Sequence, residues 1–555
     1  MQIQTIGGKE FACMLSGGAF KLAAYRQDIN DLNVFPIPDG DTGDNMLMTF
    51  GSGADAAKKA GNNLGAVSKA AAEGMLLGAR GNSGVILSRI FAGITSEFSG
   101  LESASIDDVK RGMKTGVAKA YGAVSNPVEG TILTVFKDAV NYADDNASGG
   151  SLEEYFRTLL DEMGRSLDRT PELLPVLAEA GVVDSGGAGL YYIFEGMKDA
   201  LEKGENYAEE KRTEVVKTAS AIDFSLFDEN SVLEFGYCTE FLLRLQRAKT
   251  DVEQFDEEEL SAYLNSVGDS VVCFKDGSIV KVHVHTKDPG GILRYCQQYG
   301  EFLTLKIENM TLQHSEAVNK GDNAQSRLAN HKNHNKKKTG IVAVAAGKGL
   351  KETFLSLGVD EVVDGGQSMN PSAGDMIAAF DKVNAERIFV FPNNGNVILT
   401  AEQAAELYDK ANVVVLNTKT IGEGYAAVSM METEGETEDI VNGVYESVEE
   451  VVTACVSKAN RNAVKNGVSV VNGDYIGFVG DEIISDDADK NEAAKKLLGK
   501  INVADYGLLL TFIGEAVTDE EAEQLKKELE KSYPETEVIV IEGDQPVYDY
   551  MFVLE

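Results

Sequence analysis

The sequence has few of the features that mark secreted or membrane-embedded proteins. Its 555 residues contain no tryptophan and only five cysteines, which are scattered and show no CxxC spacing. This argues against a disulfide framework and favours a reducing, cytoplasmic compartment. No apolar run approaches the roughly 18 residues of a membrane span. The N-terminal segment has no basic stretch followed by an apolar run, so we expect no signal peptide.

Basic residues and histidine are also scarce. Lys and Arg number 51 against 89 Asp and Glu, which gives a formal net charge of −38. Such a surface repels phosphate backbones, so we expect no nucleic-acid partner. Only five histidines are present, and none lies in residues 1–202. A general base in that part of the chain would therefore be a carboxylate, or its chemistry needs no base.

The chain is patterned in three different ways, and we predict a multidomain protein. Residues 1–202 carry apolar side chains at helical spacing almost throughout, for example over 55–77, which predicts an all-helical bundle or barrel. Residues 223–315 follow the order β-α-β-β-α-β, which is typical of an α+β ferredoxin-like domain. Residues 340–555 alternate strand-like and helix-like runs, which predicts an α/β region with a parallel sheet, as one unit or two joined lobes.

The segment NVFPIPDGDTGDNM, residues 33–46, is the strongest functional signal of the chain. Asp39 and Asp41 stand one residue apart in a turn rich in Gly and Pro, and this spacing can direct both carboxylates at one point. Carboxylates suit a hard cation such as Mg²⁺, which proteins usually hold with one or two of them together with substrate phosphates. The turn indicates a metal–nucleotide site; the alternative is an Asp/Gly turn that caps a helix.

Glycine-rich segments before further helical runs also indicate a phosphate site. GARGNSG, residues 78–84, precedes the run VILSRIF, and such a loop offers free backbone N–H groups and the positive end of a helix dipole. Gly130-Thr131 and the segment VDSGG at 183–187 also precede expected helices. Asn82 or Ser83 as an ordinary N-cap is the alternative. The Walker pattern of P-loop proteins is absent from the sequence.

Together, NVFPIPDGDTGDNM, GARGNSGVILS, PVEGTILTV and VVDSGGAGL resemble, in this order, the ATP-binding subunit of bacterial fatty acid kinase (FakA). The N-terminal domain of that family is similar to the DhaL domain of dihydroxyacetone kinases (DAK). The resemblance implies a DhaL-like helical barrel that holds ATP and two Mg²⁺ ions. Asp39 and Asp41 match the metal-binding carboxylates, and Asn33 is the nearest counterpart of a third ligand. Thr42 stands where DhaL proteins have histidine, which favours the fatty acid kinase branch.

The resemblance also implies the residues of the catalytic and nucleotide-binding site. The catalytic candidates are Asp39, Asp41 and Arg80. Arg80 would steady the γ-phosphoryl group, and pairing at the surface is its alternative role. The residues that match nucleotide-contacting positions are Thr42, Gly43, Asn45, Met46, Gly81, Asn82, Ser83, Gly84, Thr131, Asp184 and Gly186.

The middle region contains a candidate zinc site. His283 and His285 lie on one expected strand, where a period of two places both on the same face. Cysteine and histidine are zinc ligands. Cys238 lies on the first expected strand, which neighbours the third in the ferredoxin-like order. Two structural histidines are the alternative. The resemblance implies a metal cluster of Cys238, His283 and His285, either structural or catalytic.

The expected function is phosphoryl transfer to a fatty acid. A fatty carboxylate is ionised at neutral pH and needs no general base, which fits a region without histidine. We predict a kinase subunit that transfers the γ-phosphoryl group of ATP to a fatty acid held by a separate fatty-acid-binding protein, giving acyl phosphate for phospholipid synthesis. A dihydroxyacetone-type kinase and a nucleotide-sensing regulator are the alternatives.

The C-terminal region resembles the DegV/FakB-like fold of the fatty-acid-binding partners. Its segments Asn393–Asn396 and Thr418–Thr420 follow expected strands, where α/β proteins bind ligands, and they are also good turn sequences. The resemblance further implies a homodimer.

Overall fold

In the computed structural model, the described residues are 3–204, 237–309 and 336–555, apart from 33, 35–39, 148–149, 248, 251, 253–254, 256–259, 262, 265–266, 268, 277 and 367–369. The chain divides into two compact units. One unit contains Met1–Lys217 and Lys336–Glu555, and the other is Thr218–Asn335. The first unit thus joins the helical and α/β regions that the sequence predicts as separate domains.

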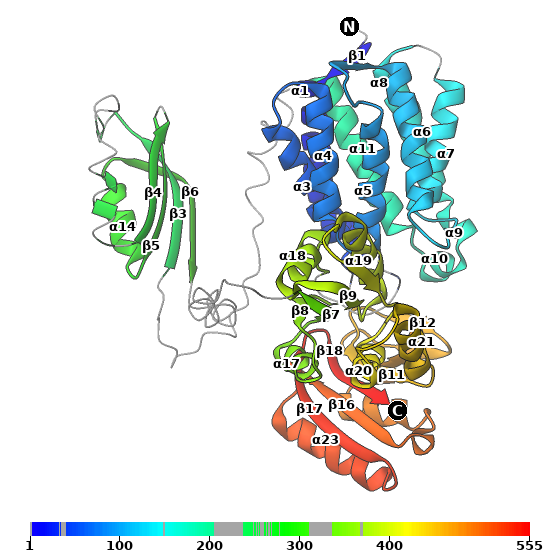
Figure 1. Cartoon of the computed structure of the whole chain (residues 1–555). Coiled ribbons are helices and arrows are strands. Elements are labelled where there is room, and N and C mark those ends of the chain that lie inside the picture. Colours follow the sequence, from blue (N-terminus) through cyan, green and yellow to red (C-terminus); the bar gives the residue numbers. More distant parts are fainter. Residues whose placement is uncertain are drawn as a thin grey trace. The chain divides into compact units, whose positions relative to one another are not determined.

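The N-terminal part of the first unit is built of helices, as its apolar spacing predicts. These are α1 (Gly8–Ala24), α2 (Arg26–Asn30), α3 (Thr42–Lys59), α4 (Leu64–Gly78), α5 (Gly81–Ser96), α6 (Ile106–Gly122), α7 (Ile132–Asn146), α8 (Leu152–Asp168), α9 (Thr170–Leu173), α10 (Pro175–Ala180) and α11 (Ser185–Lys203). Figure 1 shows the long helices side by side, and α1 packs on α11, α3 on α4, α5 on α6 and α7 on α8. The short strands β1 (Thr5–Gly7) and β2 (Ser103–Ser105) pair antiparallel.

Aromatic side chains hold the central helices together. Phe91 of α5 and Phe136 of α7 stack against Phe194 of α11, with ring centroids 6.0 and 5.8 Å away. Phe50 of α3 meets Phe91 edge-on at 5.0 Å. All four rings are at most 1% exposed, and burial of each contributes about 1.5–3 kcal/mol. These contacts fix α3, α5, α7 and α11, the helices that begin within or just after the four sequence motifs.

The single helix expected over 55–77 is two helices, α3 and α4. Gly61 has φ +84°, a left-handed conformation that commonly ends a helix. The Asn63 side chain then accepts the N–H of Ala66 at 3.0 Å and caps the start of α4. The apolar periodicity runs through this break, and only the Gly–Asn–Asn sequence marks it.

The α/β part begins with the expected parallel sheet. Its strands are β7 (Lys337–Ala345), β8 (Glu361–Asp364), β9 (Ala385–Phe391) and β10 (Asn412–Val415), in the order β10-β9-β7-β8. Its helices are α17 (Lys348–Ser356), α18 (Ala373–Val383), α19 (Gly395–Leu407), α20 (Ile421–Met430) and α21 (Thr437–Val448).

A second sheet follows, in the order β15-β14-β11-β18-β16-β17, with only β16 and β17 parallel to each other among its described pairs. The elements of this lobe are β11 (Val452–Lys458), β12 (Ala463–Lys465), β13 (Val468–Val470), β14 (Tyr475–Val479), β15 (Glu482–Asp487), α22 (Lys490–Leu498), η1 (Val503–Asp505), β16 (Leu508–Gly514), α23 (Asp519–Ser532), β17 (Glu537–Gln545) and β18 (Tyr548–Leu554). Phe389 of the first sheet and Phe512 of the second belong to one buried cluster. The two lobes therefore share a core.

The helical and α/β parts are joined through buried polar contacts. α19 packs on α5, and α18 packs on α4. Gln403 of α19 is 1% exposed. Its side chain accepts hydrogen bonds from Ser88 Oγ at 3.2 Å and Arg89 Nε at 3.0 Å, and donates to the carbonyl of Leu76 at 2.6 Å. Arg89 also pairs with Glu406 at 2.5 Å.

The second unit contains one antiparallel sheet, in the order β4-β5-β3-β6. Its elements are β3 (Tyr237–Leu245), β4 (Asp269–Asp276), β5 (Ile279–Thr286), α14 (Pro289–Cys296) and β6 (Gly300–Asn309). Ile292 and Cys296 of α14 are buried in one cluster with Phe241, Val282 and Val284 of the sheet. The expected neighbourhood of the first and third strands is observed, since β3 pairs with β5. The helix expected over 256–267 falls largely outside the described residues.

Candidate functional site

Four helices of the N-terminal part begin close to one another. α3, α5, α7 and α11 start at Thr42, Gly81, Ile132 and Ser185. The Ser185 hydroxyl donates to Thr42 Oγ1 at 3.2 Å, which links α11 to α3. The carboxylate of Asp184 accepts the N–H of Ile132, which links α11 to α7. First-turn N–H groups lack partners within their own helix and carry the positive end of its dipole, so this convergence can bind phosphate.

The start of α5 lies against α3 because its glycines have no side chains. Gly81 has φ +59°, and a Cβ there would stand 2.6 Å from Asn45 Nδ2. A Cβ at Gly84 would stand 2.4 Å from Thr49 Oγ1. The same threonine oxygen accepts the N–H of Arg80 at 3.2 Å. The glycines predicted to cradle phosphate therefore also set the distance between α5 and α3.

The start of α3 is fixed by Asn30, which none of the sequence motifs includes. Its Oδ1 accepts the N–H of Gly43 at 2.7 Å, and its Nδ2 donates to Asp44 at 2.6 Å. Arg26 pairs with the same carboxylate at 3.0 Å. Asn30 is 7% exposed. A single polar residue at the end of a short helix carries no sequence signal of its own, and its burial and bonds reveal its role.

Asp184 is the N-cap residue of α11. It accepts the N–H of Gly187 at 2.7 Å, and its own N–H donates to Thr170 Oγ1 at 3.1 Å. Burial raises the pKa of the Asp184 carboxyl to about 6, although the N–H groups of Gly187 and Ile132 act in the opposite direction. The described contacts of Asp184 are those of a cap, and its contact with nucleotide stays a prediction.

Other predicted nucleotide residues also have packing roles. Thr131 is the N-cap residue of α7, and its hydroxyl donates to the carbonyl of Val128 at 2.8 Å. Met46 is fully buried, and a Cβ at Gly189 would stand 2.5 Å from its sulfur. Gly186 lies in the first turn of α11, and Asn82 and Ser83 lie in that of α5.

Asp41, the N-cap residue of α3, is held by the α/β part. Asn370 Nδ2 donates to Asp41 Oδ2 at 2.5 Å. Arg80 Nη1 donates to the carbonyl of Asn370 at 2.8 Å, and Arg80 Nη2 pairs with Asp375 Oδ2 at 3.3 Å. The Arg80 side chain is 19% exposed. Its guanidinium is thus paired with the α/β part, and its contact with the γ-phosphoryl group stays a prediction.

The predicted metal ligands are only partly among the described residues. Asp39 and Asn33 lie outside them, and within the described part of the chain no group of three His, Cys, Asp or Glu side chains could hold a metal ion. The residues that are described fit a magnesium nucleotide, because Asp41 lies where the helix N-termini meet. Asn82 Oδ1 and Asn370 Oδ1 are buried and have no hydrogen-bond partner among the described residues. Buried acceptors of this kind suit a bound donor or cation.

The strand register brings together the three positions of the candidate zinc site. Cys238 of β3 is the cross-strand partner of His285 of β5, and Glu240 is the partner of His283. Directly opposite positions in an antiparallel pair have Cβ atoms about 4.5–5.5 Å apart. The backbone register therefore places Cys238 beside the positions of His283 and His285 in the sheet.

Asn393 and Thr418, from the two C-terminal loop candidates, bond to each other. The Asn393 N–H donates to Thr418 Oγ1 at 3.1 Å, and the Thr418 hydroxyl donates to Asn393 Oδ1 at 2.9 Å. Asn393 Nδ2 donates to the carbonyl of Val344 at 3.0 Å. Asn394 is the N-cap residue of α19, and Asn396 lies in its first turn. These contacts tie β7, β9 and β10 together, which favours the turn interpretation.

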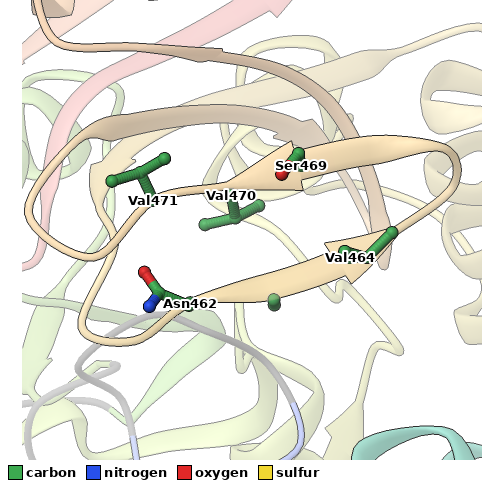
Figure 2. Close-up of a pocket in the computed structure, with 6 residues that line it drawn as sticks. Asn462, Val464, Ser469, Val470 and Val471 are labelled. Carbon is green, nitrogen blue, oxygen red and sulfur yellow. The ribbon is translucent and has the colours of Figure 1, made fainter.

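A surface hollow lies on the hairpin of β12 and β13. Figure 2 shows Asn462, Val464, Ser469, Val470 and Val471 around it. No residue predicted for the nucleotide or zinc site lines it.

Among the described helices, none combines the length and apolar character that a membrane crossing requires.

Family models match all three regions of the chain. The DAK2 domain matches residues 36–199. The middle domain of FakA-like fatty acid kinase proteins matches residues 234–317, and their C-terminal domain matches residues 340–555. The DAK2 match covers all four helix starts described above and Asp41.

Relatives match along the whole length. A protein of Staphylococcus epidermidis is 37% identical over 560 residues, and protein YloV of Bacillus subtilis is 37% identical over 562 residues; each match covers 100% of both chains. Among solved structures, a fatty-acid-binding DegV family protein from Thermus thermophilus matches with a TM-score of 0.30 and 14% identity, over 39% of this chain and 99% of its own. The dihydroxyacetone kinase of C. freundii with AMP-PNP and Mg²⁺ matches with a TM-score of 0.26 and 18% identity, over 36% of this chain and 35% of its own.

Both structural likenesses are weak, whereas the sequence relationships span the chain. The order of a DAK2 domain, a middle domain and a C-terminal domain is the architecture of the FakA component of fatty acid kinase. This confirms the family that the four motifs indicate. The chain belongs to the FakA-like family of fatty acid kinase proteins.

Proposed function

We propose that this chain is a kinase subunit that transfers the γ-phosphoryl group of ATP to a fatty acid presented by a separate fatty-acid-binding protein. The product would be an acyl phosphate for phospholipid synthesis. The observation that carries the proposal is the convergence of the first turns of α3, α5, α7 and α11 next to Asp41. The family descriptions support the fatty acid as acceptor.

Different residues of the site would bind the phosphates and the metal ions during phosphoryl transfer. Backbone N–H groups of the Gly81–Gly84 turn would bind phosphate oxygens. Asp41 and Asp39 would hold two Mg²⁺ ions, with Asn33 as a further ligand, and these ions would neutralise the charge of the transferring group. Arg80, which precedes this turn, would steady the γ-phosphoryl group.

The acceptor chemistry fits the composition of the helical part. A carboxylate oxygen of the fatty acid attacks the γ-phosphorus, the bond to the β-phosphate oxygen breaks, and ADP leaves. The nucleophile is already ionised, so no proton has to be removed. A triose hydroxyl would require a base, and because residues 1–202 contain no histidine, that base would have to be a carboxylate.

The other regions complete the proposal. The middle unit would have a ferredoxin-like plan and bind zinc through Cys238, His283 and His285. This is supported by the register of β3 and β5. The C-terminal region would have a DegV/FakB-like fold, and the chain would act as a cytoplasmic homodimer.

The test is transfer from labelled ATP in the presence of Mg²⁺ and oleate, with and without a fatty-acid-binding protein. We expect acyl phosphate only with that protein, and its loss in Asp41→Ala. Asp55→Ala is the matched control, because Asp55 lies on the same helix with a side chain 70% exposed. Transfer to dihydroxyacetone instead would favour the triose kinase, and bound ATP without transfer would favour the regulator.

A further inference from the structure

A segment of the α/β part contacts the start of α5. Residues 370–375 are the three residues before α18 and the first three residues of that helix. Ser372 forms an isolated antiparallel bridge with Arg80, and the N–H of Ala373 donates to the carbonyl of Ala79 at 3.1 Å. Backbone hydrogen bonds thus join this segment to the residues just before the glycine-rich turn, although the two lie about 290 residues apart in the chain.

Hydrogen bonds within this segment cap the start of α18. Ser372 and Asp375 form a capping box, in which the Ser372 N–H and hydroxyl donate to Asp375 Oδ2 at 2.8 and 2.7 Å. The same oxygen lies 3.3 Å from Arg80 Nη2. The capping box therefore also joins the start of α18 to the Arg80 guanidinium.

Asn370 is the residue that this segment places at the helix N-termini. It is 1% exposed, and its Nδ2 lies 2.5 Å from Asp41 Oδ2. A Cβ at Gly81 would stand 3.1 Å from the same nitrogen, so the amide also borders the glycine-rich turn. Asn370 Oδ1 is buried without a hydrogen-bond partner among the described residues. An amide with one unpartnered buried oxygen is costly unless a ligand satisfies it.

We propose that Asn370 is a positioning residue for the metal–nucleotide site, supplied to the helical part by the α/β part; this rests on the proposed function. Its amide N–H fixes the plane of the Asp41 carboxylate and thereby the direction of the carboxylate oxygens. Carboxylates that bind metals are commonly oriented by such outer hydrogen bonds, and loss of one typically lowers metal affinity about 10–100-fold. The α/β part is then a component of the nucleotide site.

The experiment measures binding of a fluorescent, non-hydrolysable ATP analogue to the full chain as Mg²⁺ is increased. We expect Asn370→Ala to raise the Mg²⁺ concentration for half-maximal binding about 10-fold or more, and saturating Mg²⁺ to restore full binding. A merely structural defect would lower the maximum instead. Asn370→Leu, which keeps the volume and removes the amide, replaces the alanine variant if that variant fails to fold.

Glu406→Gln is the matched control, since Glu406 joins the same two parts through Arg89, which is not a predicted site residue. We expect its Mg²⁺ dependence to equal that of the parent. Equal shifts in the Glu406 and Asn370 variants, or no shift in either Asn370 variant, would overturn the proposal.

Asp41→Asn separates failure of this inference from failure of the proposed function. Suppose that the parent binds the analogue with Mg²⁺ and that Asp41→Asn does not. If the Asn370 variants then match the parent, only the positioning role of Asn370 is refuted. If the parent shows no Mg²⁺-dependent binding, both proposals fall.

Discussion

The Asp184 carboxyl, at the N-terminus of α11, is a buried acid whose pKa lies at about 6, against an ordinary value of 3.8. Burial is the main cause, and hydrogen bonds from Gly187 and Ile132 oppose it. A carboxyl whose pKa is raised by folding binds its proton more tightly in the folded state. Its contribution to stability is therefore greatest at low pH and declines as pH rises from about 4 to about 6.

Asp184→Asn should consequently stabilise the protein at neutral pH. The amide oxygen can still accept the Gly187 N–H, and the charge is gone. We expect the gain in the free energy of unfolding to shrink by about 1 kcal/mol between pH 7 and pH 5, since the parent carboxyl takes up a proton in that range. Thermal unfolding midpoints of both proteins across this range measure the difference. A gain that does not change with pH would contradict the raised pKa.

Gly81 is a second residue at which local geometry makes a prediction. Alanine at this position would adopt φ +59° and bring its Cβ against the Asn45 amide. We expect Gly81→Ala to destabilise the protein by about 1–3 kcal/mol, seen as a lower thermal midpoint. Gly51→Ala is the control, because Gly51 lies in α3 with nothing near its Cβ position and should be neutral or slightly stabilising. Equal effects of both substitutions would contradict this account.

Among the elements, helix and strand periodicity predicts most of the fold. The helical region, the parallel sheet and the pairing of β3 with β5 follow from it. The break between α3 and α4 does not, because apolar spacing continues across Gly61 and Asn63. The mixed second sheet is not predicted either, since pairing between strands distant in the chain leaves no local pattern.

The register of β3 and β5 carries the prediction for the middle unit. We expect the purified chain to contain about one zinc ion and Cys238→Ser to lose it, as measured by elemental analysis, because the thiolate is one of the three proposed ligands. Cys273→Ser is the control, since Cys273 pairs with Val282, one residue out of step with both histidines. Absence of zinc from the parent, or its retention in Cys238→Ser, would remove the zinc proposal.

At the scale of the whole molecule, the main finding is that the helical and α/β parts form one unit. Four motifs in the sequence indicate the helix starts of the site, and the structure brings those starts together. The sequence does not indicate Asn30, Asn370 or Gln403. Each is a lone polar residue whose role comes from its burial and its hydrogen bonds. Asn30 bonds the start of α3 within the helical part, whereas the packing of the two parts creates the contacts of Asn370 and Gln403.

The most direct test of the central claim is a crystal structure of the full chain with Mg²⁺ and a non-hydrolysable ATP analogue. We expect the phosphates at the first turn of α5, between the starts of α3, α7 and α11, with Mg²⁺ bound by Asp41 and Asp39. Nucleotide bound instead at the loops after β9 and β10, with the helix N-termini unoccupied, would contradict the account.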